Sequence, residues 1–215
     1  MSVFPSTIFD LDCRGCPRLS DFLDDNKRDH PDYHARPVAP FGAADPALLI
    51  VGLAPGMHGA NATGRPFTGD HAGVLLYQTL YDFGFSSRPD STSSQDGLTL
   101  LDCRITNAVK CLPPQNKPTG EEIRTCNHFL KAELETLKPG ACVIALGGIA
   151  HSAVLRAFGL KVKEYPFVHN KLHKLPNEFS MIDSYHCSRY NTQTKRLTEP
   201  MFQAVFQQAR DLIVQ

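Results

Sequence analysis

The sequence has no long apolar run, and nowhere do the roughly 20 consecutive apolar residues needed to cross a bilayer occur together. The first residues, up to Cys13, also lack the basic segment followed by an apolar segment that is typical of a secretory leader. Hydrophobic residues make up 42% of the chain and charged residues 20%, values that are ordinary for a globular protein. We therefore expect a cytoplasmic protein that does not contact a membrane.

Several signatures of nucleotide binding are missing as well. No GxxxxGK[ST] stretch is present, which excludes a P-loop phosphate cradle, and no GxGxxG stretch is present, which excludes the dinucleotide fingerprint. There is also no cluster of carboxylates of the kind that holds Mg²⁺, which argues against a metal-dependent nucleotide hydrolase.

The chain has no net charge, so its overall charge does not indicate a polyanionic partner. The distribution is more informative, because residues 156–215 contain 9 basic and 5 acidic side chains. Such a weakly basic face fits local contact with phosphates better than strong coating of DNA, although an ordinary solvated surface explains the charges equally well.

Short apolar runs alternate with helical patterns along the chain. The runs are typical of buried strands because Gly or Pro bounds them, and one helix opens with the capping-box pair Thr119 and Glu122. The sequence predicts strands at residues 47–53, 104–109, 141–146 and 181–185. It predicts helices at residues 72–85, 119–137, 149–158 and 198–214, with a loop at residues 86–95.

This alternation implies an α/β fold with a central, mainly parallel four-stranded sheet flanked by helices. We find no internal repeat and no sign of a second domain, so we expect residues 1–215 to form one domain. A site in such a sheet forms at the carboxyl ends of the strands. Those ends fall at residues 54–70, 107–111, 147–150 and 186–196.

The loop after the first predicted strand is rich in glycine. Residues 52–70 hold five glycines and two prolines. Because glycine lets the backbone come close to a ligand, the loop favours a ligand-binding role over an inert surface turn.

Three motifs occupy these strand ends in order: GLAPG with GRPFTGD, then TNAVKC, then SYHCSRYNTQTKRLT. They resemble, in order and spacing, the motifs of the uracil-DNA glycosylase superfamily. The sequence most resembles the iron–sulfur type B branch, family 5, whose hallmark is an apolar residue at the position of Leu53. The resemblance runs from Cys13 to the last helix. It implies a uracil-DNA glycosylase-like fold with an N-terminal metal-ligand segment. It also implies a monofunctional enzyme of base excision repair that hydrolyses the N-glycosidic bond of uracil in DNA and leaves an abasic site.

Seven cysteines without a secretory leader indicate metal-binding or structural thiols rather than disulfides. The resemblance implies that the metal ligands are Cys13, Cys16, Cys111 and Cys126. Four thiolates suit either tetrahedral Zn²⁺ or a [4Fe–4S] cluster, and their spacing does not separate the two. The resemblance implies the cluster, in a structural role that ties the N-terminal segment to the helix at Thr119. We expect Cys103 and Cys142 to be core residues.

The resemblance also implies roles for three residues around the base. Phe67 would stack on the extruded base, an interaction worth about 1–3 kcal/mol. Asn107 would read the base edge, since an amide offers a donor and an acceptor to N3–H and O4 of uracil. His186 would donate to O2, where negative charge collects as the bond breaks. Without the motifs, a core Phe, a turn Asn and a surface His would be the better interpretations. Relatives commonly have Pro after this His, whereas this chain has Cys187.

Leu53 cannot orient a water nucleophile, so another group must assist. Asp70 is the candidate, because an anion near the sugar favours the developing positive charge. Its alternative role is to cap the helix that follows. His58 and Asn61 lie in the same loop and could substitute.

The remaining expectations concern the wall of the pocket and the DNA. Base-binding residues implied by the resemblance include Gly52, Leu53, Ala54 and Gly56. Residues 188–196 resemble the loop that enters the minor groove and helps to push the base out. Phosphates would be contacted by Arg189, Lys195 and Arg196. The side chain that inserts into the base stack as a wedge would be Tyr190 or Leu197.

A pocket with few polar contacts is expected to accept hypoxanthine, xanthine or ethenocytosine besides uracil. The partner is DNA that contains uracil or other deaminated bases, and the protein is expected to be a monomer. The main alternative is a metal-stapled module that binds damaged DNA or a nucleotide without cutting it.

Overall fold

Four parallel strands form the centre of the computed structural model, which describes residues 8–213. They are β2 (Leu48–Gly52), β3 (Cys103–Asn107), β4 (Cys142–Leu146) and β6 (Ser180–Ser184). The order across the sheet is β1-β3-β2-β4-β6-β5, and its two edges are the antiparallel strands β1 (Phe41–Gly42) and β5 (Leu172–Lys174). The predicted four strands are confirmed as the centre, and the predicted sheet was two strands too narrow.

The edge strands were not predicted because their sequences show almost no alternation of apolar and polar residues. β1 has two residues, one of them Gly42, where an added Cβ would lie 2.2 Å from the carbonyl oxygen of Cys103. β5 has three residues, of which His173 and Lys174 are polar. Neither strand is long enough to show the alternation that marks a strand in a sequence.

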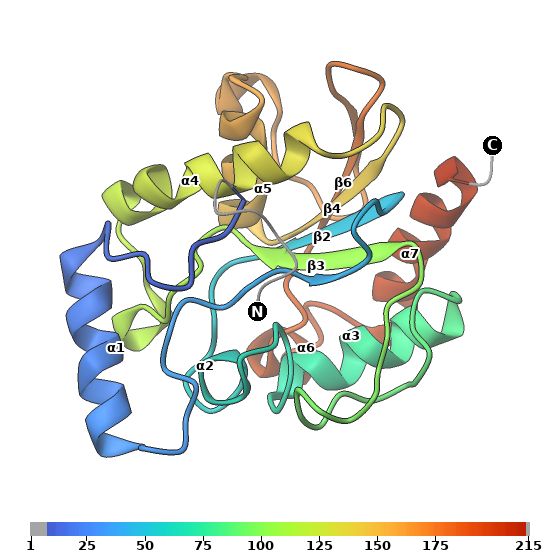
Figure 1. Ribbon diagram of the computed structural model, residues 1–215. Coiled ribbons are helices and arrows are strands. Elements are labelled where there is room, and N and C mark those ends of the chain that lie inside the picture. Colours follow the sequence, from blue (N-terminus) through green and yellow to red (C-terminus); the bar gives the residue numbers. More distant parts are fainter. Residues whose placement is uncertain (1–7, 214–215) are drawn as a thin grey trace.

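Helices cover both faces of the sheet (Figure 1). One face carries α4 (Gly120–Glu135) and α5 (Gly148–Ala157), and the other carries α3 (His71–Asp82) and α7 (Glu199–Ile213). These are the four predicted helices, each within a few residues of its predicted bounds. Val214, the predicted end of the last helix, lies outside the described residues. Within residues 8–213, no helix combines the length and the apolar character that a bilayer crossing needs.

Three further helices were not predicted: α1 (Pro17–Asp29), α2 (Ala60–Thr63) and α6 (Arg189–Gln193). α1 is mostly polar and buries only a narrow stripe that includes Leu19 and Leu23. α2 and α6 have four and five residues, too few to display a helical period. Two single 3₁₀ turns, Pro114–Asn116 and Val162–Glu164, complete the regular structure.

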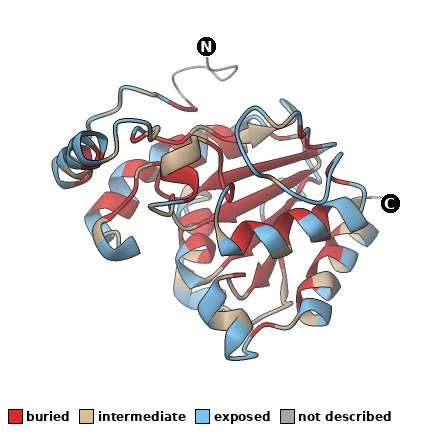
Figure 2. Cartoon of the chain, turned by 90° about the horizontal axis from the view of Figure 1, so that it is seen from below, coloured by how far each residue is buried: buried red, intermediate tan, exposed pale blue. Residues whose placement is uncertain are grey.

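The core forms two apolar layers, one on each side of the sheet. Along β2, Leu48 and Ile50 face the layer of α3 and α7, while Leu49 and Val51 face the layer of α4 and α5. In Figure 2 the four central strands are buried, whereas the helices expose their outer faces. Each fully buried aliphatic side chain stabilises the fold by about 1.5–3 kcal/mol. Cys103 and Cys142 are buried in this core, which confirms the prediction for both.

Local capping sets where the helices begin. The hydroxyl of Thr119 accepts the N–H of Glu122 at 3.2 Å, and the Glu122 carboxylate accepts the N–H of Thr119 at 2.7 Å. This reciprocal pair confirms the predicted capping box and opens α4 beside the end of β3.

Candidate active site

A cavity of about 410 Å³ lies at the carboxyl ends of β2, β3 and β6. Gly52, the last residue of β2, pairs with Asn107, the last residue of β3, so the loops that follow both strands emerge side by side. The residues that line the cavity are Leu53, Ala54, Gly56, Ala60, Phe67, Asp70, His71, Ala72, Asn107, Asn116, His186, Ser188 and Arg189. The structure thus brings Phe67, Asn107 and His186 together from three separate segments.

Two rings form one wall of this cavity. The rings of Phe67 and His186 stack with centroids 5.8 Å apart and planes inclined by 27°. Phe67 has a left-handed backbone, with φ at 54°, which is uncommon for an aromatic residue. Behind it, a Cβ added to Gly52 would lie 2.8 Å from the Phe67 ring and 2.4 Å from Oδ1 of Asn107. Only glycine at position 52 therefore leaves room for both side chains.

The loop that carries Phe67 is anchored by a buried ion pair. Arg65 donates to the Asp96 carboxylate at 2.7 Å, and both side chains are almost fully buried. Burial raises the pKa of Asp96, but hydrogen bonds from Arg65 and from backbone N–H groups outweigh it and hold the pKa well below its usual range. The carboxylate therefore stays ionised, and Arg65 also donates to Ser91 and Ser94, which joins the segment of Phe67 to the predicted loop at residues 86–95.

Asn107 presents an unsatisfied acceptor to the cavity wall. Its Oδ1 is buried and has no hydrogen-bond partner among the described residues. A buried acceptor without a partner costs about 1–3 kcal/mol. The amide is therefore poised for a ligand that carries a donor.

His186 is neutral in this environment, because burial lowers the pKa of its ring to about 4. Its backbone carbonyl accepts from the Asn191 side chain at 2.8 Å, which ties it to α6. The next residue, Cys187, is fully buried and packs in the core, and burial raises the pKa of its thiol. The Cys187 side chain thus anchors the chain in the core directly after His186.

Asp70 belongs both to the cavity and to a helix terminus. Its Oδ1 accepts the N–H of Gly73 at 2.9 Å, so it is the N-cap of α3. Its other oxygen faces the glycine-rich loop, where a Cβ added to Gly59 would lie 2.6 Å from Oδ2. Burial raises the pKa of Asp70, and the backbone hydrogen bonds at the helix terminus oppose that shift. Both of the roles considered from the sequence are therefore compatible with its position.

The other predicted base-binding residues surround the same space. Leu53, Ala54 and Gly56 line it directly, and Gly52 lies immediately behind Phe67 and Asn107. His58 and Asn61 do not line the cavity. His58 is exposed and its Nδ1 lies 2.8 Å from the Tyr33 hydroxyl, while Asn61 is buried in α2.

The predicted DNA-contacting segment is partly helical rather than an extended loop. The Ser188 hydroxyl accepts the N–H of Asn191 and caps α6. Arg189 lies on the rim of the cavity, and Tyr190 is 70% exposed. Lys195 and Arg196 are also exposed, and the Arg196 guanidinium lies 4.7 Å from the centre of the Tyr185 ring.

The prediction that Leu197 could act as a wedge was wrong. Leu197 is 1% exposed and packs in the core, and its N–H donates to the Asn191 carbonyl. Only Tyr190 of the two candidate wedges faces solvent.

Two residues of the rim, His71 and Asn116, were missed by the sequence analysis. His71 Nε2 lies 3.1 Å from the Thr192 hydroxyl, so it bridges the start of α3 and α6 across the mouth. Asn116 has a left-handed backbone, with φ at 57°, and reaches the cavity from the turn before α4. The stretch PPQN at residues 113–116 is typical of a turn, but nothing local in the sequence indicates that the turn faces the cavity.

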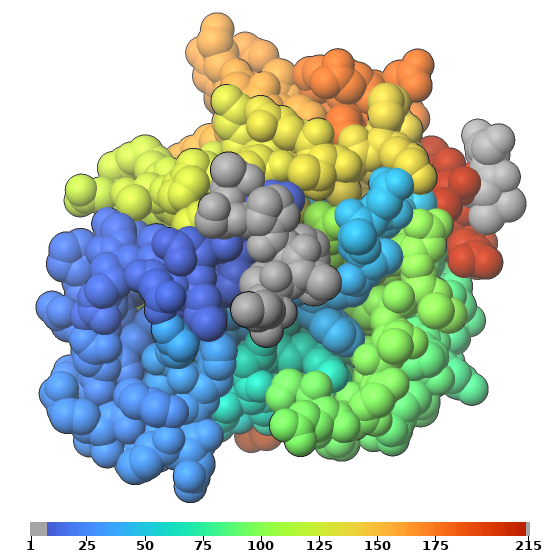
Figure 3. Space-filling view, viewed as in Figure 1, coloured from blue at the N-terminus to red at the C-terminus, as the bar shows by residue number. Residues whose placement is uncertain are grey.

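The four predicted metal ligands come together at a second place. Cys13, Cys16, Cys111 and Cys126 line one small cavity beside α1 and α4, and none of them forms a disulfide. Figure 3 shows the N-terminal segment lying against α4. There Arg18 donates to the Glu122 carboxylate at 2.7 Å.

The thiols are held in an environment that does not favour free thiolates. Burial, together with the neighbouring charges of Cys126, Glu122 and Cys13, raises the pKa of Cys16 to about 11. Four thiolates at this place therefore require a cation to offset their repulsion. The backbone N–H of Lys110 donates to Cys126 Sγ at 3.3 Å, an orienting contact of the kind found around metal-bound sulfur.

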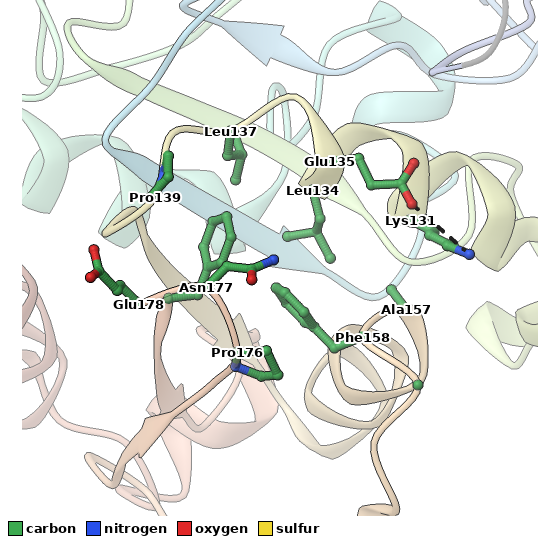
Figure 4. A pocket seen from close by; sticks show the side chains of 12 residues that line it. Lys131, Leu134, Glu135, Leu137, Pro139, Ala157, Phe158, Pro176, Asn177 and Glu178 are labelled. Atoms are coloured by element: carbon green, nitrogen blue, oxygen red, sulfur yellow. Dashed lines mark ion pairs between the residues drawn. The ribbon is translucent and has the colours of Figure 1, made fainter.

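A larger groove, of about 810 Å³, lies elsewhere on the molecule (Figure 4). It is walled by side chains from the ends of α4 and α5, such as Leu134 and Phe158, and by Pro176 and Asn177 before β6. These positions are at the amino ends of β4 and β6, whereas sites in parallel sheets form at the carboxyl ends. No group of potential metal ligands or perturbed carboxylates converges there, so we assign the site to the smaller cavity.

The fold and the cavity together define an α/β protein with a candidate site at the carboxyl edge of its sheet, where the rings of Phe67 and His186 form one wall. A profile of the uracil DNA glycosylase superfamily matches residues 39–210. The chain therefore belongs to the uracil-DNA glycosylase superfamily, as the sequence motifs predicted.

Three curated relatives, each named type-5 uracil-DNA glycosylase, align with 93% of this chain. The protein of Thermus thermophilus is 45% identical and is covered over 93% of its length. That of Mycobacterium leprae is 41% identical over 91% of its length, and that of Pyrobaculum aerophilum is 38% identical over 88%. The predicted family 5 branch is confirmed by these relatives.

Proposed function

We propose that this protein removes uracil from DNA by hydrolysing the N-glycosidic bond, as its type-5 relatives are named for doing. The observation that carries the proposal is the convergence of Phe67, Asn107 and His186 on one cavity. The product would be an abasic site, the substrate of the next step of base excision repair. The seven cysteines, all unpaired among the described residues, fit the reducing conditions of the cytoplasm.

The base would enter the cavity after leaving the helix stack. Phe67 would stack on its face, and the unsatisfied Oδ1 of Asn107 would accept N3–H while the amide nitrogen donates to O4. This pairing supports uracil over cytosine, because N3 of cytosine carries no hydrogen. Extrusion costs a few kcal/mol and costs least at a U·G mismatch.

Bond cleavage would place negative charge on the base and positive charge on the sugar. The C1′–N1 bond breaks with its electron pair going to the base, and a neutral His186 donates its N–H to O2 as the charge develops there. The Asp70 carboxylate would favour the cationic sugar, and water adds to C1′ with loss of a proton to solvent. The side chain of Leu53 takes no part in orienting this water, since that side chain has no polar atom.

DNA would lie across the face that carries α6. Arg189, Lys195 and Arg196 would contact phosphates, and Tyr190 would fill the gap that the base leaves. We further propose that the protein acts as a monomer, because the cavity is complete within one chain.

The cysteine group fits a [4Fe–4S] cluster held by Cys13, Cys16, Cys111 and Cys126. The four sulfurs line one small cavity and none forms a disulfide, which supports a shared metal group. The cluster would supply a structural cross-link between the N-terminal segment and α4, and a tetrahedral zinc ion is the alternative that four thiolates also suit.

One assay tests the proposed reaction. Purified protein is incubated without Mg²⁺ with single-stranded and U·G oligonucleotides, and alkali-labile sites and free uracil are measured. We expect release of uracil in amounts equal to the abasic sites. Binding without release would instead identify a damage-binding module. A parallel duplex with hypoxanthine measures the wider base range, for which we expect slower release because Asn107 matches uracil.

The cofactor is tested separately from the activity. We expect about four iron atoms per chain and a brown protein that absorbs in the visible blue. Zinc in place of iron, with a colourless protein, would contradict the cluster assignment and leave the glycosylase proposal standing.

A further inference from the structure

Asp183 is buried in β6 three residues before His186, and it takes no part in the cavity. Its Oδ1 lies 2.7 Å from Nδ1 of His151 on α5, and its Oδ2 lies 2.9 Å from Nε2 of His173 on β5. The backbone N–H of Val168 also donates to Oδ2, at 3.2 Å. The carboxylate therefore joins three elements and is satisfied by donors alone.

The partners of His151 determine its charge. Its Nδ1 faces the Asp183 carboxylate and its Nε2 lies 2.8 Å from the carbonyl oxygen of Tyr165, so both nitrogens face acceptors. Each nitrogen must then carry a proton, which makes the ring an imidazolium. The other groups around it are the rings of His173, 5.4 Å away, and Phe167, 5.6 Å away with its edge toward the ring. Asp183 is thus the counter-ion of a buried cation.

A metal ion would not fit these distances equally well. Bonds of about 2.0–2.2 Å from a tetrahedral zinc ion to nitrogen and oxygen would hold the two atoms about 3.3 Å apart. The 2.7 Å between His151 Nδ1 and Asp183 Oδ1 is instead the length of a charge-assisted hydrogen bond.

The side chain and the backbone of Asp183 both bind residues 165–171, which we call the clamp segment. His151 holds the Tyr165 carbonyl, and Asp183 Oδ2 holds the N–H of Val168. The N–H of Asn170 donates to the Asp183 carbonyl at 2.7 Å, and the N–H of Asp183 donates to the Lys171 carbonyl at 3.1 Å. These contacts join the clamp segment to Asp183 on both of its sides, in addition to the turn bond from the N–H of Lys171 to the Val168 carbonyl at 3.1 Å.

The clamp segment in turn holds the residue before His186. Nδ1 of His169 accepts the N–H of Tyr185 at 3.1 Å, and the two rings stack with centroids 5.0 Å apart and planes at 10°. Burial lowers the pKa of His169, which keeps the lone pair on Nδ1 available. Arg196 lies over the Tyr185 ring at 4.7 Å. Tyr185 is thereby fixed in its backbone and in its ring.

We propose that Asp183 is a positioning residue for His186, acting with a protonated His151 through the clamp segment and Tyr185. The inference rests on the role proposed above for His186. A hydrogen bond that stabilises a transition state must be held to about 0.5 Å, and within residues 8–213 Phe67 is the only ring that stacks on the neutral ring of His186. The orientation of the ring therefore depends on the backbone that precedes it.

Asp183→Asn tests this chain of contacts. The Asn side chain would direct an N–H at one of the two histidine donors. One of the two hydrogen bonds to His151 and His173 is therefore lost, while the size and shape of the side chain are kept. We expect the single-turnover rate of uracil release to fall by about 10-fold or more. Affinity for abasic-site DNA should stay within about 2-fold, because no DNA-facing residue changes.

Met181→Ala is the matched control. Met181 is fully buried on the same strand, two residues before Asp183, and it belongs to the apolar core layer of α4 and α5 without a side-chain hydrogen bond to the clamp segment among the described residues. We expect it to lower the melting temperature and to leave the rate unchanged well below that temperature. Equal rates for Asp183→Asn and the wild type, or an equal loss of rate in both variants, would overturn the proposal.

The charge state is tested without activity. ¹⁵N NMR of the histidine side chains should show both nitrogens of His151 protonated in the wild type. A neutral His151, or stoichiometric zinc that His173→Ala removes, would overturn the assignment. A wild type that releases no uracil would reject the proposed function, and the NMR result would still decide whether His151 is a cation.

Discussion

Burial sets the chemical state of the side chains around the cavity. It lowers the pKa of His186 to about 4 and leaves Oδ1 of Asn107 without a partner. Both side chains are therefore prepared to act as neutral hydrogen-bonding groups before any DNA arrives. A neutral donor at O2 gains strength as the leaving base becomes an anion, whereas equal binding of substrate and transition state would not accelerate the reaction.

The depressed pKa of His186 gives the stability a defined dependence on pH. Between pH 4 and pH 6.5 the unfolded chain binds a proton on this ring that the folded protein does not bind. The free energy of unfolding should therefore rise with pH across that window and level off above it. Urea unfolding at pH 5 and pH 7 measures this effect, and we expect a smaller change for His186→Gln. Equal changes in the two proteins would contradict the assigned protonation state.

The motifs predicted that Phe67, Asn107 and His186 lie at one edge of the sheet, and the structure brings all three to one cavity. Their roles there stay predictions. Leu197 was misjudged because an apolar residue in a polar segment looks the same in a sequence whether it faces solvent or the core. His71 and Asn116 were missed because their proximity to the cavity depends on how two loops fold back.

Helix and strand termini carry most of the chemistry. Asp70 begins α3, His186 follows β6 and Asn107 ends β3. The sequence predicted the four inner strands from their apolar runs and the four long helices from their periodicity. It could not predict β1, β5, α2 or α6, since elements of two to five residues have no readable period and form only against their neighbours.

The two roles of Asp70 can be separated by substitution. Ser is as good an N-cap as Asp, so Asp70→Ser should keep the free energy of unfolding within about 0.5 kcal/mol and still remove the anion. Asp70→Ala should lose about 1 kcal/mol as well as the anion. We expect both variants to release uracil more slowly under single-turnover conditions, by about 10²-fold. A wild-type rate for Asp70→Ser would remove the carboxylate from the mechanism and leave it only the capping role.

At the scale of the molecule, one face of a protein without net charge must meet a polyanion. Arg189, Lys195 and Arg196 lie on the α6 side, and Arg189 reaches the rim of the cavity. The four cysteines proposed as metal ligands instead line the small cavity beside α1 and α4. Overall composition could not reveal this arrangement, which depends on how the chain folds.

The phosphate contact proposed for Arg189 has a measurable salt dependence. Each phosphate contact contributes about 0.9 to the slope of log affinity against log salt. Arg189→Ala should therefore reduce the slope for abasic-site DNA by about that amount. Lys131→Ala, an exposed position beside the groove of Figure 4, is the control and should leave the slope unchanged.

The central claim is that Phe67, Asn107 and His186 together hold a uracil base in the cavity at the end of β2 and β3. Titration of the ¹⁵N-labelled protein with free uracil tests it most directly, with the side-chain amide of Asn107 and the ring of His186 as reporters. We expect both signals to shift in a saturable manner with uracil and to stay unchanged with adenine. The absence of any shift at these residues, or shifts confined to the groove beside Leu134 and Phe158, would contradict the account.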